Sequence, residues 1–318
     1  MRLGALVLAG AGSLLFAVAT GSVSIGWQEL WSILLGDHSA PNYILVTELR
    51  LPRAITAFAC GGMLALAGAL MQVLLRNPLA DPYILGVSGG AAVGALSALL
   101  IGLAGLWLTG GAFIGAMLSM LLVFALAHGR GAWTPTRLLL TGVVVAAGWG
   151  AIISLILSLS ADTTLRGMIF WLLGDLSQAP HPGLGIGTLV LGLLVALVSA
   201  RELNVLVFGE LKARALGIGV DRLRLRLYIL ASLLTAVAIT IAGNIGFIGL
   251  IVPHLTRLIV SHDHRVLLPA STLIGAIFLV IADTLARSAF SPLQLPVGVM
   301  TALIGVPLFL YLLRRSPH

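Results

Sequence analysis

Charged residues are scarce in this sequence, and their scarcity is its most informative feature. Asp, Glu, Lys and Arg together make up 9% of the 318 residues, whereas about 25% is typical of soluble domains. Hydrophobic residues make up 59%, and the mean hydropathy is +1.11. This composition excludes a soluble globular domain and a disordered chain. The sequence therefore predicts an integral membrane protein.

Cysteine and lysine each occur once, which excludes several kinds of site. Because Cys60 is the only cysteine, this chain alone forms no disulfide, thiolate-rich zinc site or iron–sulfur cluster. Because Lys212 is the only lysine and follows Glu210 and Leu211, the phosphate-binding loop G-x-x-x-x-G-K-[ST] is absent. We therefore expect no ATP-binding motif, no catalytic residue and no enzymatic activity in the chain itself.

The formal net charge of +7 does not indicate nucleic-acid binding, because such a site needs basic residues clustered on one wet face. In a chain this apolar, basic residues instead set the orientation in the bilayer. His262 and His264 flank Asp263 at the end of a predicted helix. Polar residues in that position are usually solvated, so no metal ion is assigned to them.

Long apolar stretches predict a single transmembrane domain over residues 1–318. An apolar helix of roughly 20 residues is needed to cross about 30 Å of hydrocarbon. Stretches of this kind indicate ten spans, near residues 3–22, 54–75, 84–106, 111–128, 138–160, 184–200, 226–243, 246–262, 266–286 and 297–313. The eighth is short and is interrupted by Gly and Pro.

The basic residues agree with both termini lying in the cytoplasm. With ten spans, four basic residues fall outside the membrane (Arg50, Arg53, Arg166 and Arg287), and Arg257 falls within a span. The other thirteen fall on the cytoplasmic side: Arg2, Arg76, Arg130, Arg137, Arg201, Lys212, Arg214, Arg222, Arg224, Arg226, Arg265, Arg314 and Arg315. This asymmetry follows the positive-inside rule.

Two segments between spans carry more structure than a turn. Residues 162–182, on the outer side, are too short to cross the bilayer and are predicted to be an interfacial element. Residues 201–225, on the cytoplasmic side, combine both signs of charge with apolar residues and predict an amphipathic helix–turn–helix. Gly217 and Gly219 suit its turn. It is either a solvated loop lying on the membrane or, as we favour, a docking surface for a cytoplasmic subunit.

Small residues recur every fourth position in three predicted spans. The stripes are Gly86, Gly90 and Gly94; Gly111 and Gly115; and Gly142, Ala146 and Gly150. Such stripes let helices approach closely in lipid, so helix packing is their expected role.

Three alternative interpretations compete with a transport function and a retained first span. The residues Arg2 and Ala17-Val18-Ala19 imitate a signal peptide, but the apolar run is long for one. Residues 86–90 match G-x-S-x-G and His254 lies in a later span, as in a serine hydrolase, but these glycines already belong to a packing stripe.

The third alternative is an ion-coupled secondary transporter. Ion coupling generally requires an acidic residue inside the membrane. Only Asp81 and Asp283 come close, and both fall near predicted span ends.

Five sequence blocks closely resemble the permease family that imports iron chelates, haem and cobalamin. They cover nearly the whole chain in order: Arg50-Leu51-Pro52-Arg53; residues 61–86, with Gly61-Gly62, Gln72 and Arg76-Asn77-Pro78-Leu79-Ala80-Asp81-Pro82; residues 203–217; Gly246-Phe247-Ile248-Gly249-Leu250-Ile251-Val252-Pro253-His254; and Leu295-Pro296-Val297-Gly298 through Gly305-Val306-Pro307.

The resemblance implies an all-α permease with ten transmembrane helices per subunit, working as a homodimer around a central translocation path. It implies the membrane half of a type II ABC importer in the bacterial inner membrane, powered by two cytoplasmic ATPase subunits. ATP and magnesium would bind to the ATPase, and no cofactor to this chain. A periplasmic binding protein would deliver a metal chelate, and haem, cobalamin and ferric siderophores remain open as cargo.

The resemblance also implies roles for individual residues. It assigns ATPase coupling to Glu210, Ala213, Arg214, Leu216 and Gly217; docking of the binding protein to Arg50, Arg53 and Arg287; the inner gate to Thr134, Pro135 and Thr136; and the path to Gly142, Ala146 and Gly150. An ordinary helix cap is the alternative role of the three gate residues. The sequence departs from the family at Gln294, where Glu is usual, and at Asp175, where Ser is more common.

Overall fold

The computed structural model describes residues 2–21, 23, 25–128, 134–177, 182–290 and 293–315, and all regular structure in these residues is helical. The all-α prediction is confirmed. The elements are α1 (Arg2–Ala19), α2 (Trp27–Leu34), the π-helix η1 (Leu45–Arg50), α3 (Leu51–Leu74), the 3₁₀-helix η2 (Pro82–Leu85), α4 (Val87–Leu100), α5 (Leu106–Ala127), α6 (Pro135–Leu159), α7 (Asp162–Leu172), α8 (Pro182–Val198), α9 (Ala200–Leu206), α10 (Glu210–Ala215), α11 (Val220–Ala242), α12 (Ile248–Ile259), α13 (His264–Ser288) and α14 (Val297–Arg315).

Ten apolar helical segments match the ten predicted spans. Five helices are long and apolar enough to cross a membrane, α8 passes the same test only together with α9, to which it is bent by 56°, and four shorter apolar helices complete the set. Each predicted range overlaps one of these segments. Arg130, which entered the prediction of orientation, lies outside the described residues.

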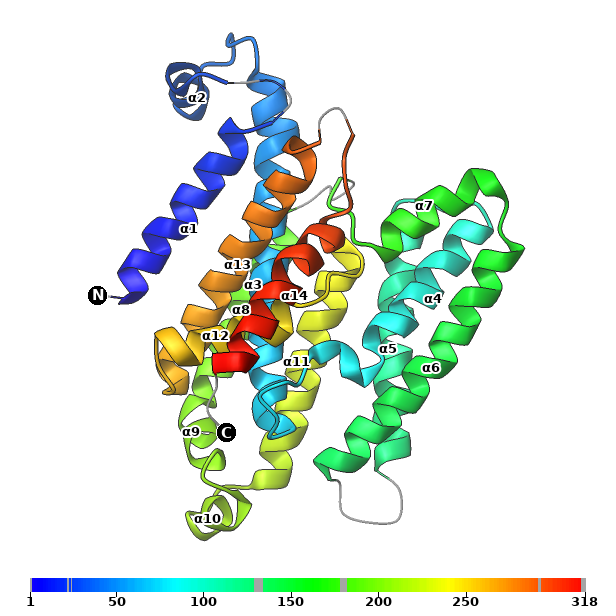
Figure 1. Cartoon of the computed structure of the whole chain (residues 1–318), viewed down its shortest axis with the longest axis vertical. Coiled ribbons are helices and arrows are strands. Elements are labelled where there is room, and N and C mark those ends of the chain that lie inside the picture. The colour runs from blue at the N-terminus through cyan, green and yellow to red at the C-terminus, as the bar shows by residue number, and fades with distance from the viewer. Residues whose placement is uncertain are drawn as a thin grey trace.

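Helix α3 forms the centre of the larger of two helix groups (Figure 1). It is buried along almost its whole length and contacts α1, α8, α11, α12 and α13. Helices α4 to α7 form the second group, which α4 and α5 join to α11. The many Gly and Ala residues of α3 give it a narrow surface, so that five neighbours fit around one helix.

Glycines set the closest helix contacts, as the stripes predict. A Cβ added at Gly90 would overlap the carbonyl of Gly115, and one added at Gly94 would overlap that of Gly111. The same holds in the centre, where Gly68 of α3 meets the backbone of Gly249. In lipid, such close backbone contact replaces the hydrophobic drive for helix association.

The central contact gives a direct prediction. Gly68→Ala is expected to destabilise the protein by about 1–3 kcal/mol, because the new methyl group forces α3 and α12 apart. Gly12→Ala is the control, since a Cβ there meets nothing within 4 Å. Thermal unfolding of the two purified variants measures the difference, and equal unfolding temperatures would contradict the account.

The connecting segments lie at two opposite ends of the molecule. Helices α2 and α7 lie at one end, called here the α2 end, and α10 lies at the other, called the α10 end (Figure 1). Within the predicted interfacial segment, α7 has 11 residues, and residues 178–181 lie outside the described part of the chain.

Candidate functional site

The segment formed by α9 and α10 is anchored by a few buried residues and presents a large apolar surface. Leu203, Leu206 and Ala213 are buried in the interior of the subunit. Four side chains are instead exposed: Val207, Phe208, Leu211 (86%) and Leu216 (70%). Gly209 and Gly217 have φ values of +109° and +79°, which glycine adopts without steric cost, so they allow the sharp turns around α10.

Glu210 connects this segment to two long helices. Its carboxylate accepts a hydrogen bond from the guanidinium of Arg224 on α11, which is buried. It also lies 3.0 Å from Nη2 of Arg76, just beyond α3. Glu210 therefore joins α10 to the ends of α3 and α11. The sequence singled out Glu210 but not these partners, which lie 134 and 14 residues away.

Helix α9 is attached separately to the start of α13. Nδ2 of Asn204 donates to Oδ1 of Asp263 at 2.7 Å, and Oδ1 of Asn204 accepts from the backbone N–H of His264 at 2.9 Å. The Asn204 amide and the backbone N–H of Arg265 stabilise the carboxylate of Asp263 and hold its pKa below the usual range. Arg214, another residue predicted to couple to the ATPase, lies apart from these contacts and forms an exposed ion pair with Asp221 at 3.0 Å.

The three predicted gate residues begin α6. Oγ1 of Thr134 accepts a hydrogen bond from the backbone N–H of Arg137 at 3.3 Å, Pro135 occupies the first turn, and Thr136 is exposed. Thr134 therefore caps the helix, which was the alternative role. Thr134 and Pro135 also border a small gap with Arg224, the partner of Glu210. Two of the predicted gate residues and the predicted coupling residue Glu210 thus lie beside the same arginine.

The predicted path residues do not share one open surface. Gly142 is buried, because an added Cβ would overlap the carbonyl of Ile84 in η2. Gly142 therefore packs inside the subunit, and its assignment to the path stays a prediction. Ala146 is partly covered, and only Gly150 lies on the exposed face of α6.

The three predicted docking arginines lie together at the α2 end, but their charged groups have internal partners. Arg50 is only 5% exposed, and its guanidinium donates to the carbonyls of Val18 (2.9 Å) and Val23 (2.6 Å). The guanidinium of Arg287 donates to the carbonyl of Ala17. The prediction is that these arginines present their charge to a binding protein. In the structure, the guanidinium groups of Arg50 and Arg287 instead hydrogen-bond to carbonyls in and just after α1, which attaches α1 to the start of α3 and to α13.

Asp283 is the centre of this arginine cluster. Its carboxylate accepts two hydrogen bonds at 3.0 Å or less from Nε and Nη2 of Arg53, and it lies 3.8 Å from Nε of Arg287. The side chain of Asp283 is 4% exposed and that of Arg53 is 17% exposed. An aspartate held between two arginines has its charge compensated already, so it does not resemble a vacant proton or sodium site. Asp81 likewise accepts a hydrogen bond from the backbone N–H of Tyr83 as the N-cap of η2.

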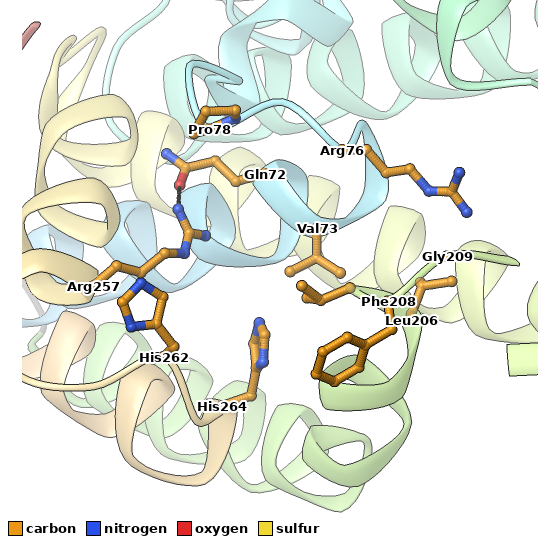
Figure 2. A pocket seen from close by; sticks show the side chains of 11 residues that line it. Gln72, Val73, Arg76, Pro78, Leu206, Phe208, Gly209, Arg257, His262 and His264 are labelled. Atoms are coloured by element: carbon orange, nitrogen blue, oxygen red, sulfur yellow. Dashed lines mark hydrogen bonds between the residues drawn. The ribbon is translucent and has the colours of Figure 1, made fainter. Parts of the chain in front are cut away.

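Two open cavities lie at opposite ends of the subunit. One, of about 300 Å³, is bordered at the α2 end by the arginine cluster, Glu48 and Gln294. The other, of about 410 Å³, lies at the α10 end between α3, the α9–α10 turn and the start of α13 (Figure 2). Among the described residues, no three His, Cys, Asp or Glu side chains are grouped as metal ligands would be.

Residues 7–315 match the FecCD transport family. The chain belongs to that family. It is 44% identical over 295 residues to the cobalamin import system permease protein BtuC of Halobacterium salinarum, covering 89% of this chain and 79% of that protein. It is 38% identical to the hemin transport system permease protein HmuU of Yersinia pestis, covering 93% and 90% of the two chains.

A solved structure agrees with membership of the FecCD family. It is described as an inward-facing conformation of a protein assigned to the metal-chelate type of ABC transporters. The TM-score is 0.85 at 30% identity, and the alignment covers 99% of this chain and 98% of the other. The resemblance read from the sequence is thereby confirmed: the chain is a multi-pass permease of the ABC type within the FecCD family, whose relatives include cobalamin and hemin permeases.

Proposed function

We propose that this chain is the permease subunit of an ATP-driven importer for a metal chelate such as haem, cobalamin or a ferric siderophore. Two copies form a homodimer around a central path in the bacterial inner membrane. The α10 end and both termini face the cytoplasm, and the α2 end faces the periplasm. ATP and magnesium bind to two separate ATPase subunits, and this chain binds no cofactor of its own.

The α9–α10 segment carries this proposal. Its exposed leucines and Phe208 form an apolar surface at the α10 end of the molecule. Exposed apolar surface flanked by charges is typical of a protein interface. The surface suits a cytoplasmic ATPase, because the chain has no phosphate-binding loop of its own.

The contacts of Glu210 supply a route for coupling. Closure of the ATPase pair would shift α10, and Glu210 would pull on Arg224 of α11, beside which Thr134 and Pro135 begin α6. The change that opens the cytoplasmic end would therefore reach α6 through one ion pair. Two states of the subunit, differing in this contact, satisfy the physical requirement for alternating access.

The opposite end suits delivery of the cargo. The cavity of about 300 Å³ beside Arg53, Arg287 and Gln294 opens at the α2 end, and we propose that a periplasmic binding protein docks over it. Arg53 and Arg287 then act with Asp283 as one basic cluster. With Gln294 in place of a carboxylate, one negative charge is missing from the rim of this cavity.

The docking of the ATPase is tested by placing a charge on the apolar surface. Leu216→Asp and Phe208→Asp are each expected to reduce ATPase co-purification at least tenfold, since desolvating a carboxylate in an apolar interface costs about 2 kcal/mol or more. Leu35→Asp is the matched control, because Leu35 is 85% exposed at the α2 end. Normal ATPase recovery with both α9–α10 variants would overturn this part of the proposal.

A further inference from the structure

The cavity at the α10 end has a basic side and an apolar side, and of its lining residues the proposed transport function uses only Arg76, as a partner of Glu210, and the α9–α10 turn that carries Phe208. Its basic side consists of Arg76, Arg257, His262 and His264, which come from the ends of α3 and α12 and from the start of α13. Its apolar side consists of Val73, Leu206, Val207 and Phe208. None of the described residues that line the cavity is acidic.

Arg257 is the residue that most needs a partner. Its guanidinium donates to Oε1 of Gln72, whose Nε2 in turn donates to the carbonyl of Leu250 at 3.0 Å. Among the described residues, no carboxylate lies within 4.0 Å of Arg257. Within this part of the chain the buried Arg50 also lacks a carboxylate, but three backbone carbonyls accept hydrogen bonds from it, whereas Arg257 has the single acceptor Gln72. A partly buried cation without a counter-charge is costly unless an anion binds beside it.

His264 supplies a second unsatisfied group at the same place. Nδ1 of its buried ring lies 2.7 Å from Oδ1 of Asn204 and therefore donates to it, so that Nε2 is an acceptor in the neutral ring, and it has no hydrogen-bond partner. Figure 2 shows the ring pointing from the start of α13 toward Val73, with Arg257 and His262 on one side and Phe208 on the other. Arg76 lies farther off on the α3 side and is already paired with Glu210.

We propose that this cavity binds a phosphate group, held by Arg257 and His262, with the apolar side taking up the rest of an anionic phospholipid. Arginine suits a phosphate because its planar guanidinium donates to two oxygens at once. The four apolar residues would make no favourable contact with a free phosphate ion, but they suit the glycerol and upper acyl chain of a lipid. The cavity lies where the helices end, at the level of the headgroups in the orientation proposed above.

A bound lipid would also influence coupling, which goes beyond the proposed function. Val207, Phe208 and Gly209 form the turn between α9 and α10, and all three border the cavity. The occupant would therefore support the turn that positions the ATPase-docking surface. Membrane composition would in this way act on the transmission segment from inside the subunit.

Native mass spectrometry of the complete, delipidated permease–ATPase complex tests the site. The probes are phosphatidylglycerol, diacylglycerol of the same chain length, which lacks phosphate, and inorganic phosphate. We expect saturable phosphatidylglycerol binding that Arg257→Gln weakens at least about tenfold, as for loss of one charge-assisted contact. Arg265→Gln is the control, because Arg265 is exposed next to His264 but does not line the cavity.

Two further variants guard against a folding defect in Arg257→Gln. Arg257→Lys keeps the charge and is expected to retain part of the affinity, and His262→Gln alters an exposed lining residue. Binding of phosphatidylglycerol but not of inorganic phosphate would establish a lipid headgroup as the source of the phosphate. Binding of inorganic phosphate that depends on Arg257 to the same degree would establish a free phosphate ion. Three results would each overturn the proposal. Diacylglycerol could bind as well as phosphatidylglycerol, the affinity for phosphatidylglycerol could be unchanged in Arg257→Gln and His262→Gln, or no lipid could bind because an ATPase carboxylate occupies the cavity.

Discussion

Glu210→Arg is expected to reduce transport roughly 100-fold while leaving the permease folded, a loss of the size expected when a coupling free energy of about 1–3 kcal/mol is removed. The new side chain would place three cations together, since Arg76 and Arg224 both contact the present carboxylate. Repulsion would then separate α10 from α3 and α11. Uptake by reconstituted vesicles, with size-exclusion chromatography to verify folding, measures the effect.

Glu202→Arg is the matched control for this reversal. Glu202 lies on the neighbouring α9 and forms one exposed ion pair, with Nη2 of Arg226 at 2.9 Å. Exposed pairs contribute roughly 0.2–1 kcal/mol, so its reversal is expected to change uptake little. Full transport by Glu210→Arg, or an equal loss in both variants, would show that the Glu210 contacts do not transmit the movement.

Asp283→Ala is expected to cause the largest loss of stability. It removes the carboxylate between Arg53 and Arg287 and leaves two partly buried cations facing each other. Breaking a buried ion pair by removing one partner costs about 3–5 kcal/mol. The consequence should extend to α1, because Arg287 also donates to the carbonyl of Ala17.

Asp221→Ala provides the comparison for Asp283→Ala. Asp221 pairs with Arg214 at 3.0 Å, and both side chains are at least half exposed, so the expected loss is at most about 1 kcal/mol. The double variant Asp283→Ala/Arg53→Met should be less destabilised than Asp283→Ala alone, because it removes one unpaired cation. Chemical unfolding in detergent measures all three, and a loss below 1 kcal/mol for Asp283→Ala would contradict the assigned role of the cluster.

The spans could be predicted from the sequence because each depends on a long local run of apolar residues. The shorter elements could not. Helix α2 has only eight residues, Trp27–Leu34, and exposes Trp27 and Trp31, so no apolar window reveals it. The π-helix η1 depends on backbone geometry continuous with α3, which composition does not encode. The glycine stripes were predictable because small residues every fourth position have one strong physical consequence in lipid.

Site residues were predictable only as far as local patterns reach. The mixed charge of residues 201–225 predicts an exposed apolar face formed by Val205, Leu206, Leu211 and Leu216; Leu211 and Leu216 are exposed, whereas Leu206 is buried. Phe208 was missed because its exposure depends on the turn at Gly209. The burial of Arg50 could not be foreseen, since its partners are backbone carbonyls near the end of α1. The burial of Gly142 could not be foreseen either, because the carbonyl of Ile84 that it contacts lies on another element.

The source of energy for transport tests the central claim most directly. The permease, its ATPase and its binding protein would be reconstituted in vesicles, and uptake of the chelate would be measured with ATP on the α10 side and with ionophores that abolish proton and sodium gradients. The account predicts uptake that requires ATP and continues unchanged without an ion gradient. Uptake that persists without ATP and stops when the ion gradient is removed would contradict it and establish an ion-coupled secondary transporter.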